Sequence, residues 1–240
     1  MKFSIIIPTY LEQKVIAGAL LQFQACKEKW PLEIIVADGA SADRTAELAG
    51  RYGDRVVVEG KRKNISSGRN LGAQYASGDI MVFLDADVRI PDPDGFFAAL
   101  RDIFAGRDNV SAVIPALQVY PRERTLQDAA VHAVVNAIIR ASGLAGIHGA
   151  KGECQVVRSD VFRAVGGYDE KLVTGEDSRL ILMVARHGRV VYPRKLVVYH
   201  SPRRFRARGY LKYFVLDWFL NTLSLALRGK PYVTEWKPVR

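Results

Sequence analysis

Two aspartates spaced i, i+2 carry the clearest chemistry in this chain. Asp85 and Asp87 directly follow the apolar run at residues 80–84, which has the pattern of a fully buried strand. A hard divalent cation needs only one or two protein carboxylates when a diphosphate supplies further oxygens, and Mg²⁺ or Mn²⁺ is commonly bound in this way. The spacing therefore lets the two carboxylates divide between a metal ion and a sugar hydroxyl of one nucleotide-diphosphate ligand.

Two earlier apolar runs, at residues 3–7 and 32–37, also end in polar or turn-forming residues. The residues at these ends are Pro8, Thr9, Tyr10, Glu12 and Asp38. The carboxyl ends of parallel strands meet at one edge of an open sheet, where ligands bind in such folds. A single Asp after a strand is as often a helix cap or a turn residue, but three such ends in register favour a nucleotide site.

Strand patterns alternate with helix patterns in the first half of the chain. Residues 12–27, 43–52 and 66–76 are compatible with helices and separate the apolar runs. This alternation predicts an α/β fold in which helices cover both faces of a mostly parallel sheet.

Longer elements are predicted beyond Pro91. Residues 110–120 have the pattern of one long strand, and residues 125–141 have that of a helix whose first turn Thr125 and Asp128 would cap. Two short strand patterns complete the globule, at residues 190–192 and 197–199.

Composition excludes disordered and fibrous proteins. The chain has 240 residues, 49% of them apolar and 25% charged, which allows one large domain or two small ones with a sizeable core. Cys26 and Cys154 lie far apart without a CxxC spacing, so neither a disulfide framework nor a zinc knuckle is predicted. We therefore expect a reducing, cytoplasmic location.

The charge balance is strongly basic. Lys and Arg number 35 against 25 Asp and Glu, a net charge of +10. This balance favours polyanionic partners, namely nucleic acid, phosphorylated substrates or an acidic membrane face, although it also serves plain solubility. The basic residues are scattered without a recognised binding motif, so we expect no nucleic-acid partner.

Taken in order, the motifs resemble the family-2 inverting glycosyltransferases with the GT-A fold from about residue 3 to residue 200. The matching stretches are SIIIPTY at 4–10 with Glu12, IIVADGASADRT at 34–45, GRNLG at 68–72, GDIMVFLDAD at 78–87, GGYDE at 166–170, GED at 175–177, and Tyr199 with His200. The resemblance implies a Rossmann-like, mostly parallel central sheet flanked by helices over residues 1–202. Residues 203–240 would add a basic cluster and an amphipathic helical tail.

The resemblance also implies roles for the matched residues. Thr9, Tyr10 and Glu12 would line the base and ribose pocket, and Asp38 would accept a hydrogen bond from the base. Asp85 would bind ribose or donor sugar, and Asp87 would coordinate Mg²⁺ or Mn²⁺ with His200 as a second ligand. The implied nucleotide-sugar site comprises Pro8, Thr9, Tyr10, Glu12, Asp38, Arg69, Asp85, Ala86 and Asp87. The family usually has Asn at the position of Leu11.

Glu176 and Asp177 match the acidic pair of the family, in which the second carboxylate is the general base. Inversion needs one base to take the acceptor proton while the acceptor oxygen attacks the anomeric carbon opposite the departing diphosphate. The alternative is a pair of acids at a helix N-terminus, which the helix dipole favours without any catalytic role.

The resemblance predicts a metal-dependent, inverting transfer of sugar from a UDP-type or GDP-type donor. The acceptor is unidentified and would be a glycan, a lipid-linked acceptor or a small molecule. Single addition is expected, because the Gln-x-x-Arg-Trp pattern of processive synthases is missing and residues 203–206 read RRFR instead. The alternatives are a sugar-phosphate nucleotidyltransferase, which would have a glycine-rich loop after the first strand, and a non-enzymatic polyanion-binding protein.

Residues 210–227 can form an amphipathic helix that contains Trp218 and is bracketed by Arg208 and Arg228. Such a helix can lie in a membrane interface, or it can pack on the sheet or on a second subunit. Asp217 and Asn221 interrupt the apolar run, which is too short to span a bilayer. We therefore expect peripheral contact with the inner face of the membrane or burial against protein.

Overall fold

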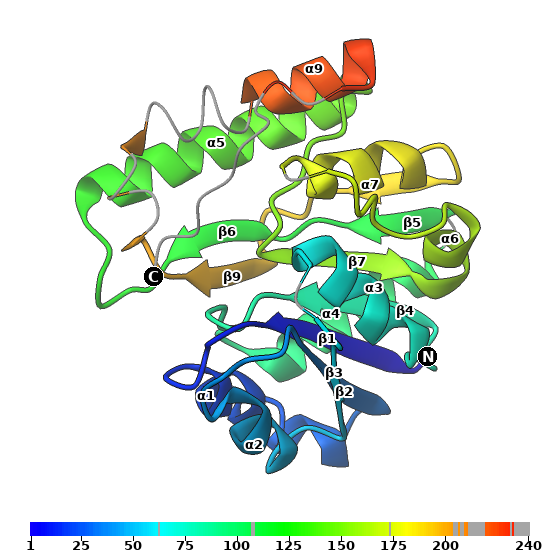
Figure 1. Cartoon of the computed structure of the whole chain (residues 1–240). Coiled ribbons are helices and arrows are strands. Elements are labelled where there is room, and N and C mark those ends of the chain that lie inside the picture. Colours follow the sequence, from blue (N-terminus) through cyan, green and yellow to red (C-terminus); the bar gives the residue numbers. More distant parts are fainter. Residues whose placement is uncertain are drawn as a thin grey trace.

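A seven-stranded sheet carries the strand ends on which the predicted site depends (Figure 1). In this computed structural model, the residues described are 1–61, 63–106, 109–172, 174–203, 206, 209–210, 219–230 and 232. The strand order is β3-β2-β1-β4-β7-β5-β8. The strands are β1 Phe3–Thr9, β2 Leu32–Asp38, β3 Arg55–Val58, β4 Ile80–Leu84, β5 Val110–Val113, β7 Cys154–Arg158 and β8 Arg189–Val191.

The pairing is mostly parallel, as predicted. Strands β1 to β4 are parallel to their neighbours within this group, β5 is parallel to β8, and only β7 runs antiparallel, between β4 and β5. The carboxyl ends of β1, β2 and β4 therefore lie at one edge of the sheet. This edge brings together Thr9, Asp38 and the residues after Leu84.

Helices cover both faces of the sheet, which confirms the predicted architecture. In β1, Phe3, Ile5 and Ile7 point into one apolar layer and Ile6 into the other, as the two-residue period of a strand requires. The first layer is packed by α1 Ile16–Leu21, α2 Thr45–Gly50 and α4 Pro93–Ala105. The second is packed by α3 Ile65–Gln74, α6 Ser159–Ala164 and α7 Glu176–Val184.

Two predicted elements differ from the structure. The single long strand predicted at 110–120 is wrong, because the chain forms β5 and then β6 Ala116–Val119 in separate sheets. Pro115 lies between them and has no N–H to donate to a continuous ladder. β6 pairs instead with β9 Val197–His200 in a parallel two-stranded sheet. The helix predicted at 12–27 is also divided, into α1 and the 3₁₀ turn η1 Ala25–Glu28.

The long helix α5 Leu126–Leu144 begins at the predicted cap. The Asp128 N–H donates to Thr125 Oγ1 at 3.1 Å, and the Thr125 N–H donates to Asp128 Oδ2 at 2.7 Å. Asn136 fixes the helix against β6, because its side chain donates to the Leu117 carbonyl at 2.9 Å and accepts from the Leu117 N–H at 3.2 Å.

The C-terminal helix α9 Asn221–Arg228 packs on the start of α7. Asn221 and Leu225 are 2% exposed, and a Cβ atom on Gly175 would lie only 2.1 Å from Asn221 Nδ2. The described end of the predicted tail helix is thus packed on protein. Trp218 and the rest of residues 211–218 fall outside the described ranges. None of the described helices combines the length and hydropathy that a membrane span requires.

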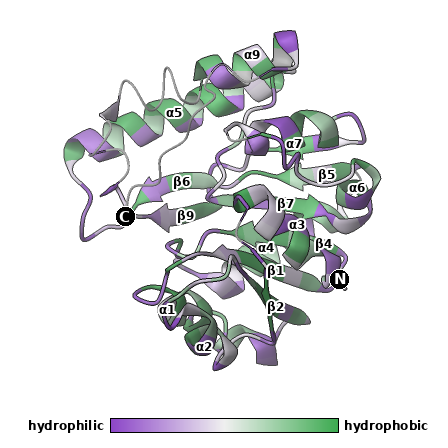
Figure 2. Ribbon diagram, viewed as in Figure 1, coloured by the Kyte–Doolittle hydropathy of each residue, from purple (hydrophilic) through white to green (hydrophobic). Residues whose placement is uncertain are grey.

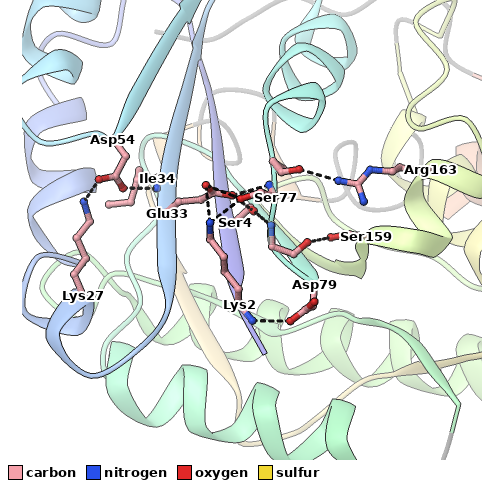
Figure 3. Close-up of polar contacts among 12 residues, drawn as sticks. Lys2, Ser4, Lys27, Glu33, Ile34, Asp54, Ser77, Asp79, Ser159 and Arg163 are labelled. Carbon is pink, nitrogen blue, oxygen red and sulfur yellow. Dashed lines mark hydrogen bonds and ion pairs between the residues drawn. The ribbon is translucent and has the colours of Figure 1, made fainter.

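At the opposite edge of the sheet, a hydrogen-bond network joins the amino ends of the strands (Figure 3). The Glu33 carboxylate on β2 accepts from Ser4 Oγ at 2.6 Å, from the Ser77 N–H at 2.7 Å and from Lys2 Nζ at 3.2 Å. These donors come from β1, from Lys2 just before it and from the turn before β4. Glu33 therefore holds three neighbouring segments in register, away from the candidate site.

We expect the Glu33 network to make folding stability depend on pH. Burial alone would raise the pKa of Glu33, but hydrogen bonds from Ser4, Ser77 and Lys2 outweigh it and lower the pKa to about 2. The stabilisation is therefore complete above the unfolded-state pKa of about 4.3 and is lost as the pH falls towards the folded-state value. Glu33→Gln should lower the free energy of unfolding at pH 7 by about 1 to 3 kcal/mol.

Urea denaturation at neutral and acidic pH measures this difference, which should shrink in acid because a protonated Glu33 resembles Gln. Glu47→Gln is the control: its exposed pairs with Arg44 and Arg51 are screened by solvent, so its effect should be smaller. A Glu33→Gln protein as stable as wild type at pH 7 would refute the role of the network.

Candidate active site

One buried arginine connects the elements that converge at the carboxyl edge of the sheet. Arg69 on α3 is 1% exposed. Its Nη2 lies 3.0 Å from Asp85 Oδ1, and its Nη1 lies 3.2 Å from Glu176 Oε1. Nη2 also donates to the Gly152 carbonyl at 2.7 Å. The guanidinium thus joins the end of β4, the start of α7 and the turn before β7.

The local sequence of α3 explains how Arg69 reaches this position. Asn64 caps the helix, with its side chain accepting from the Ser67 N–H at 2.9 Å. Gly72 allows close packing on β1, because a Cβ atom there would lie 2.5 Å from Ile6 Cγ2. The first turns of α3 are therefore held tightly over the carboxyl edge, where Arg69 meets the two carboxylates.

A second set of contacts, through Tyr168 and Gln155, holds Arg69 and the backbone of Asp177 in place. The Arg69 guanidinium lies over the Tyr168 ring, 5.1 Å from its centroid. The Tyr168 hydroxyl donates to Gln155 Oε1 at 2.5 Å, and Gln155 Nε2 donates to the Asp177 carbonyl at 3.2 Å. Sequence reasoning gave none of these supporting roles. Tyr168 lies within the quoted GGYDE stretch, whereas Gln155 has the pattern of an ordinary strand residue.

The environment of Glu176 and Asp177 changes their acidity. Burial raises the pKa of Asp177 well above its usual range, and the neighbouring Glu176 charge raises it further. The Ser178 N–H, which donates to Asp177 Oδ1 at 2.6 Å, acts in the opposite direction and lowers the pKa. Burial also raises the pKa of Glu176, whereas the Arg69 charge opposes that rise. A carboxyl group with a raised pKa takes up a proton more readily near neutral pH, as a general base must.

The ends of β1 and β2 form a separate, tightly bonded corner. Asp38 is fully buried; it accepts from Thr9 Oγ1 at 2.9 Å and from the Ser41 hydroxyl at 2.7 Å. The Glu12 N–H donates to Thr45 Oγ1 at 2.8 Å. The structure therefore brings the predicted base-pocket residues together, and it adds Ser41 and Thr45 from the same quoted motif.

Leu11 departs from the family pattern at this corner. Its φ of 56° lies in the left-handed region, which Asn tolerates far better than Leu. Its N–H donates to Ser41 Oγ at 2.8 Å. The backbone conformation thus explains why Asn suits this position, and the Ser41 bond holds the conformation in this chain with Leu.

The two aspartates after β4 have different partners. The Asp85 side chain faces Arg69, whereas Asp87 Oδ2 lies 3.1 Å from Arg203 Nη2 at the start of the basic segment. Ala86 between them is 4% exposed. Tyr120 links Asp87 to β9, because its hydroxyl donates to the Asp87 carbonyl and its N–H donates to the His200 carbonyl at 3.2 Å.

His200 is paired with a second histidine that the sequence did not single out. His200 Nε2 lies 2.9 Å from His132 Nε2, and His132 Nδ1 lies 2.8 Å from the Asp128 carbonyl. A carbonyl only accepts, so we assign the proton of His132 to Nδ1; its Nε2 then accepts from His200 Nε2–H. Burial, followed by the Lys151 charge, lowers the pKa of His132 to about 4, which keeps the ring neutral at pH 7.

The donor atoms at this edge suit a divalent cation that is shared with a ligand. Among the residues that the structure describes, no three His, Cys, Asp or Glu side chains are grouped to hold a metal. The Asp87 carboxylate and the His200 imidazole would give only two protein ligands. Two are enough for Mg²⁺ or Mn²⁺ when a diphosphate contributes the other oxygens. Metal ligation by Asp87 and His200 remains a prediction.

Comparisons with known sequences agree with the geometry. The chain matches the family described as Glycosyl transferase family 2 over residues 4–166. It is 27% identical over 249 aligned positions to the succinoglycan biosynthesis protein ExoA of Rhizobium meliloti (strain 1021), covering 93% of this chain and 74% of that protein. It is 37% identical over 95 residues to dolichol-phosphate mannosyltransferase of Pyrococcus furiosus, covering 38% of this chain and only 27% of that protein.

Solved structures give the fold. Mannosyltransferase PcManGT from Pyrobaculum calidifontis, in complex with GDP-Man and Mn²⁺, has a TM-score of 0.69 at 23% identity over 88% of this chain and 59% of its own. TarS of S. aureus, in complex with UDP-GlcNAc, has a TM-score of 0.64 at 17% identity over 95% of this chain and 73% of its own. Both likenesses identify the GT-A fold, and the chain belongs to glycosyl transferase family 2.

Proposed function

We propose that this chain transfers a sugar from a nucleotide-diphosphate sugar to an acceptor, with inversion and with a divalent metal ion. The Arg69 network carries the proposal, because it ties Asp85, the carboxylate expected at the donor sugar, to Glu176 beside the expected base. The bound GDP-Man of PcManGT and the bound UDP-GlcNAc of TarS support a GDP or UDP donor.

In the proposed reaction, Asp177 accepts the proton of the acceptor hydroxyl while the acceptor oxygen forms a bond to the anomeric carbon. The bond from that carbon to the diphosphate breaks, and its electron pair leaves with the nucleoside diphosphate. Glu176 is the less suitable base, because its carboxylate is held 3.2 Å from the Arg69 guanidinium, which favours its ionised form. Arg69 also orients the Asp85 carboxylate, because its Nη2 lies 3.0 Å from Asp85 Oδ1.

The donor would lie along the carboxyl edge of the sheet. Pro8, Thr9, Tyr10, Glu12 and Asp38 would surround the base and ribose, with Asp85 and Ala86 beside the sugar. Mg²⁺ or Mn²⁺ held by Asp87 and His200 would supply charge neutralisation for the diphosphate. Arg203, which is paired with Asp87 in the structure, would be a further cation available to the phosphates.

The acceptor and the site of action remain proposals as well. The similar protein of Pyrococcus furiosus is named dolichol-phosphate mannosyltransferase. This name supports a lipid-linked acceptor, and hence transfer at a membrane surface. We propose a single addition per acceptor, because residues 203–206 lack the pattern of processive synthases.

The first test is donor binding, and Asp87→Ala should abolish its dependence on metal. Wild-type protein should gain thermal stability with one of UDP-glucose, UDP-GlcNAc or GDP-mannose, and more so with Mn²⁺, because a ligand that binds only the folded state stabilises it. Calorimetry with UDP or GDP plus Mn²⁺ then compares the variants.

Asp102→Ala is the matched control, since Asp102 is an exposed carboxylate on α4. Equal nucleotide affinity in wild type and Asp87→Ala, with metal present, would remove Asp87 from the metal site. If none of the donors bound wild type, the proposed donor class would fall.

Asp177→Asn should separate binding from chemistry. We expect donor affinity to stay near that of wild type and release of the nucleoside diphosphate to slow by roughly 10²- to 10⁴-fold, the usual effect of losing a general base. Steady-state release of UDP or GDP from the donor identified above measures this. A wild-type rate in Asp177→Asn combined with a slow rate in Glu176→Gln would transfer the role of base to Glu176.

A further inference from the structure

Helix α5 has its polar face turned towards the protein, which is the reverse of an ordinary surface helix. Asp128 and His132 are 1% exposed. Asn136, one turn further along, bonds the backbone of β6, and Arg140 lines a cavity with Lys151 and Tyr192. These four residues recur every four positions and form one stripe that faces inward. The stripe contains every Asp, Glu, Lys or Arg residue of the helix.

The outward face of α5 is apolar. Of the nine exposed residues of the helix, only Gln127 is polar. Leu126 is 91% exposed, Val134 58%, Ile138 41% and Leu144 89%. Figure 2 shows much of the α5 ribbon in green. A helix whose outer face is apolar is normally covered by protein or lipid, so this face requires a partner.

Exposed apolar side chains are concentrated at this end of the molecule, where α5 and α9 both lie (Figure 1). Within the described ranges, seven of the twelve exposed large hydrophobic residues belong to α5 or to the segment around α9. They are Leu126, Val134, Ile138, Leu144, Phe219, Leu227 and Tyr232. We call the four α5 residues among them the docking face.

Exposed positive charge lies at the same end of the molecule as the docking face. Among the described residues of 121–150 and 201–232, seven are Lys or Arg and two are Asp or Glu. Arg122 and Arg124 are exposed before α5, and Arg228 and Lys230 are exposed at the end of α9. Two copies joined through this face would bring like charges together, whereas an anionic surface would neutralise them.

We propose that the docking face binds the surface of an anionic lipid bilayer. Val134 and Ile138 enter the boundary between head groups and acyl chains, and the arginines at this end of the molecule contact the anionic head groups. α5 then lies in the plane of the membrane without crossing it. The inner side of the same helix carries His132 against His200, so a lipid-linked acceptor would approach the proposed metal edge across one helix diameter. Only this last step rests on the proposed function.

Vesicle sedimentation of the full chain tests the docking face without donor or metal. Wild type should bind phosphatidylcholine vesicles that contain phosphatidylglycerol and bind pure phosphatidylcholine weakly, with some binding retained at high salt. The double variant Val134→Glu/Ile138→Glu should lose on the order of tenfold or more in partition coefficient. Glu has a higher helix propensity than Val or Ile at exposed positions, so the helix should persist.

Leu21→Glu is the matched control, because Leu21 is 49% exposed on α1 and should not affect binding. Equal binding by wild type and the double variant would overturn the proposal. A wild-type dimer in solution that the double variant converts to monomer would also overturn it, because a second copy would then cover the face.

A fluorescent label at Ile138→Cys gives a direct reading of insertion. The two native cysteines, Cys26 and Cys154, are both buried, so an environment-sensitive thiol label reacts selectively at the new site. We expect a blue shift on addition of anionic vesicles at position 138 and none at Leu21→Cys. Unchanged emission at position 138, with wild-type protein bound to the vesicles, would assign the membrane contact to another surface.

Discussion

A single buried charge, the guanidinium of Arg69, determines how this site is assembled. Placing a guanidinium at 1% exposure carries a large desolvation cost, which only close, correctly oriented partners can offset. Asp85, Glu176 and the Gly152 carbonyl bond the two Nη groups and the Tyr168 ring faces the guanidinium, whereas Nε has no hydrogen-bond partner among the described residues. These partners come from elements far apart in sequence, so the folded sheet and the ion network stabilise each other. Loss of Asp85 or Glu176 would leave the buried positive charge of Arg69 with one negatively charged partner in place of two.

The same network separates the acidities of neighbouring carboxyl groups. Arg69 contacts Glu176 directly and favours its ionised form, whereas Asp177, one residue further, is buried beside that negative charge. Gly175 before the pair has a φ of 74°, a conformation that glycine adopts without strain, and α9 packs against it. Helix α7 is therefore positioned from both sides, by Arg69 at its first turn and by α9 at its cap. Fold and proposed chemistry thus depend on the same contacts.

Local sequence patterns predicted those features of the fold that depend on neighbouring residues in the chain, such as strand ends and helix caps. The strand ends with Thr9, Asp38 and Asp85, the two-sided helix cover and the Thr125 cap of α5 are confirmed. Pro115 shows the limit, because apolar residues on both sides of it hid a break between two sheets. The Tyr168–Gln155 support, the His132–His200 pair and the Gly152 contact arise from tertiary pairing between distant segments, for which one sequence holds no signal. The outward face of α5 was also missed, since helical periodicity gives an apolar stripe but not the direction in which it points.

Burial and the Glu176 charge together raise the pKa of Asp177, and the proposed role of Asp177 as base depends on this. NMR titration of ¹³C-labelled side-chain carboxyl groups, assigned by comparison with Asp177→Asn, measures it directly. We expect Asp177 to titrate well above the ordinary value of about 3.9 for aspartate. We also expect its pKa to fall in Glu176→Gln, which removes the neighbouring negative charge. An ordinary pKa for Asp177, unchanged by Glu176→Gln, would show that neither burial nor the Glu176 charge acts on this carboxyl group.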